Sequence, residues 1–76
     1  MAYENGAEVF NDRLKSLTTR HKDCRTEMHG TGRMIYYAPT DRWFIEYYCP
    51  DQNELHEIYT PETNAIALRI AAGSAS

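Results

Sequence analysis

The first hydrophobic positions along the chain have the spacing of a helix. Within residues 4–17, apolar side chains recur at intervals of three and four positions: Ala7, Phe10, Leu14 and Leu17. Residues with this spacing share one side of an α-helix, with polar residues on the other side. The pattern therefore predicts an amphipathic N-terminal helix over residues 4–17.

The middle of the chain alternates between apolar and polar residues, which is typical of half-buried β-strands. Residues 24–29 alternate in this way, and the glycines within 30–32 predict a hairpin turn, because glycine accepts a positive φ. Residues 33–38 and 42–48 then form a second hairpin around the turn APTD. A weaker fourth strand is predicted over residues 54–59.

The last segment carries the signals of a second helix over residues 60–73. Thr60 suits the N-cap, Pro61 suits the first helical position, and Gly73 predicts the stop. Apolar residues again follow helical spacing: Ile66, Ala67, Ile70 and Ala71. Residues 73–76 are expected to form a frayed tail.

These elements predict one compact α+β domain over residues 1–76, since 76 residues are too few for two ordinary domains. The expected fold is an N-terminal helix, a three- to four-stranded antiparallel sheet and a C-terminal helix, with both helices on one sheet face. This packing buries both apolar helix stripes and one face of the sheet. A domain of this size is only marginally stable without a metal, a disulfide or a partner.

The turn APTD sets a register for the second hairpin. If Tyr37 lies opposite Arg42, apolar residues meet apolar residues, and Arg33 meets Glu46. The remaining pairs are Tyr36 with Trp43, Ile35 with Phe44, and Met34 with Ile45. The matching side chains support this register, because a shift by one residue would exchange the two faces of the sheet.

This register divides the aromatic residues of the hairpin between two faces. The uncharged face is the predicted core side: Met34, Tyr36, Ala38, Trp43, Ile45 and Tyr47. The second face mixes aromatic, aliphatic and charged residues: Arg33, Ile35, Tyr37, Arg42, Phe44, Glu46 and Tyr48. A sheet with helices on one side commonly leaves the other side open. We therefore expect the second face to expose an apolar patch with a charged rim.

This second face is the candidate functional surface. Its expected partner-binding residues are Ile35, Tyr37, Phe44 and Tyr48 in a partly exposed patch, Arg33, Arg42 and Glu46 at the rim, and Asp51 and Glu54 in the acidic segment that follows. Ile58 is expected to extend the patch. The patch is interpreted as a contact for another protein or a second copy, as tyrosines that tolerate water without a further role, or as a base-stacking platform.

The distribution of charge bears on these interpretations. The net charge is −3, with basic residues concentrated in 13–25 and acidic residues in 41–62. An acidic total disfavours nonspecific nucleic-acid binding, which depends on neutralising phosphates. We therefore predict a small module that binds another protein stoichiometrically. The alternative is a nucleic-acid-binding domain that uses segment 13–25 together with the sheet aromatics.

The two cysteines are predicted to be free thiols. In the predicted sheet, Cys24 and Cys49 lie at opposite ends, roughly 20 Å apart at about 3.3 Å per residue. That separation excludes both a disulfide and a shared zinc ion. The N-terminus lacks the basic and apolar regions of a signal peptide, and no apolar run approaches the length needed to cross a bilayer. A reducing, cytoplasmic setting is therefore expected.

The histidines predict no catalytic site. The register aligns four polar side chains in one row across the second face: His29, Arg33, Glu46 and His56. We interpret this row as a polar ladder between strands, because such pairs stabilise sheets. No enzymatic activity, cofactor or metal is expected.

The predicted order helix–strand–strand–strand–helix resembles the double-stranded RNA-binding domain. That family carries lysines where this chain reads Thr60-Pro61-Glu62-Thr63, so the resemblance does not extend to RNA binding.

A second resemblance is to small phage-encoded inhibitors such as anti-CRISPR proteins, in size, layout, aromatic sheet face and acidic residues: Asp51, Glu54, Glu57 and Glu62. This resemblance implies that the protein binds a bacterial CRISPR effector complex or nuclease and blocks access of nucleic acid. Neither a nucleic acid nor a membrane is the expected partner, and a homodimer stays open as an alternative.

Overall fold

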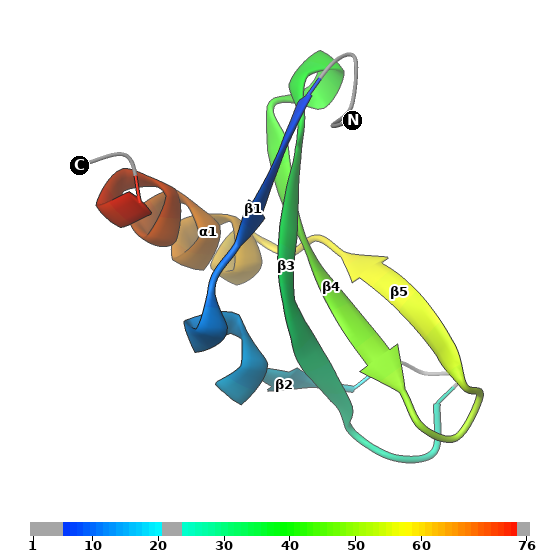
Figure 1. Cartoon of the computed structure of the whole chain (residues 1–76). Helices are drawn as coiled ribbons and strands as arrows, with labels where there is room; N and C mark the ends of the chain where they lie inside the picture. The colour runs from blue at the N-terminus through cyan, green and yellow to red at the C-terminus, as the bar shows by residue number, and fades with distance from the viewer. Residues whose placement is uncertain (1–5, 21–23, 75–76) are drawn as a thin grey trace.

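The computed structural model describes residues 6–20 and 24–74 of the chain. Its elements, in chain order, are β1 (Gly6–Phe10), η1 (Asp12–Ser16), β2 (Thr18–Thr19), β3 (Met28–Tyr37), η2 (Ala38–Thr40), β4 (Arg42–Cys49), β5 (Glu54–Ile58) and α1 (Pro61–Ser74), where η marks a 3-10 helix (Figure 1). No helix in these two ranges is long and apolar enough to cross a membrane.

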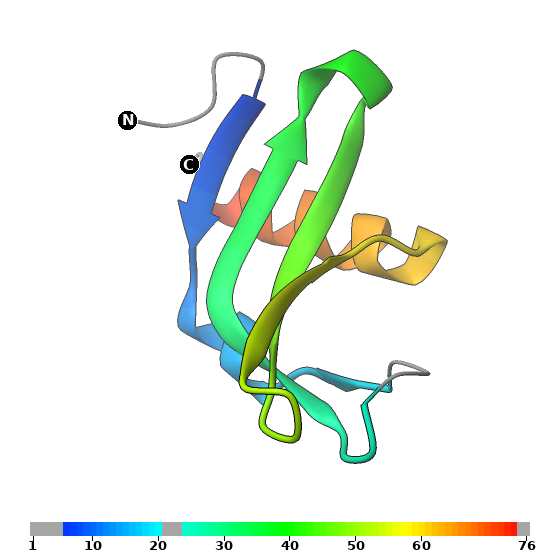
Figure 2. The ribbon, with the colours of Figure 1, turned by 90° about the vertical axis from the view of Figure 1, so that its right-hand side faces the viewer.

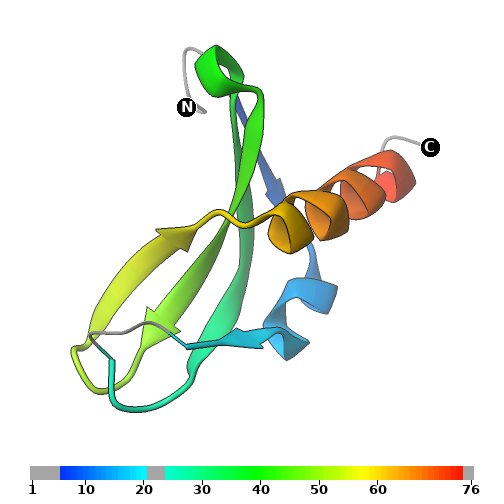
Figure 3. The same cartoon turned by 180° about the vertical axis from the view of Figure 1, so that it is seen from behind.

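The five strands form one antiparallel sheet with the order β1-β3-β4-β5, and the short β2 pairs with the start of β3. Helix α1 lies against one side of this sheet, as the views from the front and from behind show (Figures 1 and 3). The fold is therefore α+β, with five strands and one C-terminal α-helix.

The predicted N-terminal α-helix is wrong. Residues 6–10 form β1, which pairs along β3 from Gly6 opposite Tyr37 to Phe10 opposite Arg33; residues 4 and 5 lie outside the described ranges. The backbone groups of this segment that face β3 form hydrogen bonds with it along the whole length of β1. This pairing outweighs a local preference for helix, which amounts to only a fraction of a kcal/mol per residue.

The end of β1 is marked by Asn11. Its backbone N–H donates to the carbonyl oxygen of Gly32 (2.8 Å), and its side chain accepts from the N–H of Arg13 (2.9 Å). The chain then turns into η1, which buries Leu14 completely while Phe10 stays exposed. The helical spacing of these two apolar residues therefore did not correspond to one buried stripe.

The predicted hairpin at residues 30–32 is also wrong. β3 is a single strand of ten residues that runs through both glycines, with an irregular register between Gly30 and Met34. Gly32 has the positive φ of 99° that this irregularity requires. A Cβ at Gly30 would lie 1.9 Å from the carbonyl oxygen of Leu14, so this glycine serves close packing of η1.

The second hairpin has the predicted register. Tyr37, Tyr36, Ile35 and Met34 lie opposite Arg42, Trp43, Phe44 and Ile45. The turn contains η2, and Asp41 adopts left-handed backbone with φ of 52°, which a short polar side chain tolerates. Ala38 belongs to this turn and is exposed, so its predicted place in the core is wrong.

The C-terminal helix was predicted correctly at its start. The Thr60 hydroxyl accepts a hydrogen bond from the N–H of Thr63 (3.0 Å), as an N-cap does. The helix continues to Ser74, so Gly73 lies within it and does not end it. The predicted tail is thus helical at residues 73–74, and residues 75–76 lie outside the described ranges.

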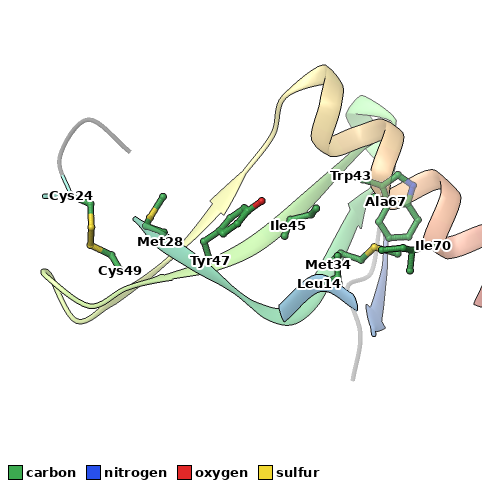
Figure 4. Packing of buried hydrophobic residues seen from close by; sticks show 10 residues of the cluster. All are labelled: Leu14, Cys24, Met28, Met34, Trp43, Ile45, Tyr47, Cys49, Ala67 and Ile70. Carbon is green, nitrogen blue, oxygen red and sulfur yellow. A yellow bond between two sulfur atoms is a disulfide. The ribbon is translucent and has the colours of Figure 1, made fainter. Parts of the chain in front are cut away.

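The core lies between the sheet and α1 and continues toward the β4–β5 turn. Figure 4 shows its buried side chains: Leu14, Cys24, Met28, Met34, Trp43, Ile45, Tyr47, Cys49, Ala67 and Ile70. Helix α1 is also held by Asn64, whose side chain accepts a hydrogen bond from the backbone N–H of Trp43 (2.9 Å). This bond satisfies a backbone group of β4 beyond the last residue that β5 pairs.

Cys24 and Cys49 form a disulfide, with their Cα atoms 6.4 Å apart, so the prediction of distant free thiols is wrong (Figure 4). The error follows from the predicted turn at residues 30–32. Because β3 does not reverse there, the chain before Met28 approaches the end of β4 that carries Cys49. The bond therefore ties the segment before β3 to the β4–β5 end of the sheet.

Replacing Cys24 and Cys49 together by alanine should lower the free energy of unfolding by about 3 kcal/mol. The disulfide links residues 25 positions apart and so restricts the unfolded chain. Urea unfolding followed by the fluorescence of Trp43 measures the loss, and reduction of the wild-type protein should reproduce it. Thiols that react in the native protein before any reduction would contradict the assignment.

A second prediction concerns alkaline pH. Burial raises the pKa of Tyr47. The folded protein therefore holds this proton more tightly than the unfolded chain, so the associated stability is complete below about pH 10 and is lost as pH rises through the raised pKa. Tyr47→Phe should lose less Tm than the wild type above about pH 10, in melting curves recorded by circular dichroism. Near neutral pH, the difference in Tm between the two proteins should not change with pH. Equal losses of Tm at alkaline pH would disprove the assignment.

Candidate functional site

The side of the sheet opposite α1 is called the open face here (Figure 2). Residues paired across antiparallel strands point to the same side, and those that share a side with Ile35 and Phe44 define this face. Its members are Glu8, Phe10, His29, Arg33, Ile35, Tyr37, Arg42, Phe44, Glu46, Tyr48, Leu55, Glu57 and Tyr59. The open face therefore draws side chains from β1, β3, β4 and β5 and from the residue after β5.

Most of the predicted binding residues come together on this face. Tyr37 and Tyr48 are exposed, and Phe44 is half-buried. Ile35 is only 4% exposed, so it forms the floor of the patch, and the expectation that it is partly exposed is wrong. Ile58 pairs with Ile45 and packs on the core side, so it does not extend the patch.

The two predicted binding residues of the acidic segment, Asp51 and Glu54, lie elsewhere. Asp51 is in the turn between β4 and β5, where its carboxylate accepts from the N–H of Arg25 (3.4 Å). Glu54 pairs with Cys49, whose side chain is in the core, so Glu54 belongs to the α1 side of the sheet. Neither residue is next to the aromatic patch.

A group of charged residues crosses the centre of the open face. We call it the Arg33 cluster: Glu8, Arg33, Glu46 and Glu57. The Arg33 guanidinium donates to Glu8 through Nε and to Glu46 through Nη1 (2.6 Å), and it lies 4.0 Å from Glu57. One cation thus stands among three carboxylates, which leaves an excess of negative charge.

The three carboxylates differ in exposure and in partners. The Glu46 side chain is 12% exposed and also accepts from the Thr31 hydroxyl (2.8 Å). The Glu57 side chain is 52% exposed, and among residues 6–20 and 24–74 its one ion-pair contact is the long one with Arg33. Glu46 is therefore a structural partner of Arg33, whereas Glu57 can receive a further donor.

The predicted row of histidines is wrong. Glu57, and not His56, lies opposite Glu46. His56 pairs with Tyr47 on the core side, and its Nε2 contacts the Gln52 side chain (3.1 Å). The irregular register of β3 moves His29 opposite Tyr48, away from Arg33. The ladder itself exists, but Glu8 and Glu57 stand where histidines were expected.

Tyr59 is a member of the face that the sequence reasoning missed. Its ring lies 5.9 Å from that of Phe44, and the Arg42 guanidinium lies 4.6 Å from its centre. Such a cation–π contact stabilises a pair by about 0.5–1 kcal/mol at an exposed site. The alternation of β5 could have identified Tyr59, since it follows Glu57 by two positions.

A shallow pocket of about 290 Å³ opens on this face, and we call it the Ile35 pocket. Its lining residues are Ile35, Tyr37, Phe44 and Glu57. Tyr48 and Leu55, paired across β4 and β5, add exposed apolar surface farther along the face. The face thus offers apolar contact, aromatic rings and the accessible carboxylate of Glu57.

A second hollow of about 380 Å³ lies where β1 meets η1. It is lined by Phe10, Asn11, Asp12, Lys15, Thr31 and Gly32. Lys15 and Asp12 pair with each other at 3.3 Å, so the charges of this hollow are matched. Within residues 6–20 and 24–74, no group of three or more His, Cys, Asp or Glu side chains is placed so that it could hold a metal ion.

No protein-family model, curated protein or solved structure matches this chain. The layout helix–strand–strand–strand–helix, on which both sequence resemblances drew, does not occur, because residues 6–10 form a strand. The function is therefore argued from the open face itself.

Glu46 is the most buried carboxylate of the Arg33 cluster and Glu57 the most exposed, so neutralising each should affect stability differently. Glu46→Gln should lower the free energy of unfolding by about 1–2 kcal/mol, because it weakens a largely buried, charge-assisted hydrogen bond. Glu57→Gln should change it by less than about 0.5 kcal/mol, as exposed ion pairs do. Urea unfolding of both variants makes the comparison. Equal losses would contradict the different roles assigned to the two carboxylates.

Proposed function

We propose that this protein is a small module that binds another protein stoichiometrically through its open face. The observation that carries the proposal is the gathering of Tyr37, Phe44, Tyr48 and Leu55 on a sheet face that α1 leaves uncovered. Exposed apolar patches with a polar rim are a common feature of protein interaction sites.

The chemistry of the patch supports a protein partner. Tyrosine and arginine are enriched at the centres of protein interfaces, because each combines a large contact area with hydrogen bonds. Tyr37 and Arg42 face each other at the η2 end of the hairpin, and Arg42 is held over Tyr59. A face prepared in this way loses little side-chain freedom on binding.

The disulfide bears on the identity of the partner. The sequence suggested a finer hypothesis, in which the partner is a CRISPR effector or nuclease in the cytoplasm. Thiols are kept reduced in the cytosol of most organisms, so Cys24–Cys49 favours an oxidising compartment instead. We therefore propose that the protein binds another protein, and we no longer propose a CRISPR effector or nuclease as the partner or the cytoplasm as the compartment.

Nucleic-acid binding, the alternative function, has less support. It would combine the aromatic face with the basic segment 13–25, of which residues 21–23 lie outside the described ranges. η1 carries Arg13 and Lys15, and it buries Leu14 on the α1 side of the sheet. On the open face, the Arg33 charge is matched by carboxylates. Single-strand platforms instead use a positive groove.

Tyr37→Ala should abolish capture of the partner by the immobilised protein, with at least a tenfold loss of affinity, or about 1.4 kcal/mol. The measurement is a pull-down with crosslinking and mass spectrometry, and native mass spectrometry tests a second copy as the partner. Leu68→Ala is the matched control, since Leu68 is 53% exposed on α1 and away from the open face.

Both variants should keep the wild-type melting temperature within a few degrees, so that any loss reports on contact and not on folding. Capture that Leu68→Ala weakens and Tyr37→Ala leaves intact would refute the proposal. A mobility shift of labelled single-stranded DNA or RNA that disappears with added salt would favour the nucleic-acid alternative.

A further inference from the structure

The Ile35 pocket lies where the apolar part of the open face meets the Arg33 cluster. Glu57 belongs to both, because it lines the pocket and approaches Arg33 at 4.0 Å. We propose that this pocket receives an arginine side chain of the partner. The inference rests on the proposed protein-binding function and adds the chemistry of the group that binds.

The charge of the Arg33 cluster is complementary to that of an arginine. The Arg33 cluster holds one guanidinium among three carboxylates, so it retains negative charge after Arg33 is counted. Glu8 and Glu46 each accept a short hydrogen bond from Arg33. Glu57 is half exposed and has no short contact in the cluster. A cation entering the pocket meets this carboxylate. An acidic partner would be repelled there.

The apolar lining of the Ile35 pocket also fits an arginine side chain. Ile35 closes the floor, and the rings of Tyr37 and Phe44 belong to the same pocket. An arginine has an apolar stem that covers such surface while its charged end stays near water. Its planar guanidinium also stacks on aromatic rings and binds carboxylates through two parallel hydrogen bonds. The lining and the carboxylate at the edge thus fit the two halves of one side chain.

The open face already contains a guanidinium–aromatic pair next to this pocket. Arg42 lies over the ring of Tyr59 at 4.6 Å, and the rings of Tyr59 and Phe44 are 5.9 Å apart. Phe44 thus contacts one ring of this pair and also lines the Ile35 pocket. A guanidinium placed in the pocket would make with its aromatic lining the same type of contact that Arg42 makes with Tyr59.

The test uses the full, disulfide-bonded chain and two peptides. The first is acetyl-Gly-Arg-Gly-amide, and the second carries citrulline in place of arginine, which has the same shape without the charge. Nuclear magnetic resonance titration follows the signals of Ile35, Tyr37, Phe44 and Glu57. The arginine peptide should shift these signals and bind at least about fivefold more tightly than the citrulline peptide, as expected for one cation–π contact and one exposed ion pair.

Variants at two glutamates sharpen the test. Glu57→Gln should reduce the affinity for the arginine peptide by about two- to fivefold, because it removes the exposed ion pair and leaves the contact with the rings. Glu54→Gln, on the same strand but on the α1 side, is the matched control and should bind as the wild type does. Equal affinity for both peptides, unchanged binding by Glu57→Gln, or no shift at Ile35 with about 10 mM peptide overturns the inference.

The outcome separates this inference from the proposed function. If Tyr37→Ala loses the partner but Glu57→Gln captures it as the wild type does, the open face binds proteins and the arginine pocket is refuted. If Tyr37→Ala captures the partner normally, the proposed function fails, and the peptide titration still decides what the pocket binds.

Discussion

The structure depends on the uninterrupted course of β3. This strand pairs with β1 and β2 along one edge and with β4 along the other, so it positions three other strands of the sheet. Its two glycines make this possible, because Gly30 lets the backbone of η1 approach closely and Gly32 accepts a positive φ. A β-bulge in this position changes the register without ending the strand. The two sides of the sheet and the position of the disulfide all follow from that geometry.

The two faces of the sheet have different tasks. On one side, α1 and Leu14 cover Met34, Trp43 and Ile45 and complete the core. On the other side, residues 6–20 and 24–74 place no helix; Arg33 is paired with carboxylates there, and aromatic residues stay accessible. Buried charges are tolerated where partners and hydrogen bonds surround them. The Arg33 cluster therefore lets a partly apolar sheet face stay ordered, which is what a binding surface needs.

The disulfide compensates for the small size of the domain. A chain of 76 residues buries too little surface for large stability, and Cys24–Cys49 restricts its unfolded state. The bond holds the segment before β3 at the end of the sheet where β4 turns into β5. It also couples the stability of the protein to the redox state of its surroundings, and it removes the basis on which a reducing compartment was predicted.

The second hairpin and the start of α1 could be predicted from the sequence alone, because short turns and helix caps are local interactions: Tyr37 opposite Arg42, and Thr60 bonded to Thr63. Most of the open face could be predicted in the same way, since strand alternation places Tyr37, Phe44 and Tyr48 once the register is known. The conformation of residues 6–17, the role of the two glycines, the disulfide and the place of Glu57 were set by long-range packing. These features depend on which strand lies beside β3, and a long-range contact of that kind leaves no periodic trace in the residues that make it.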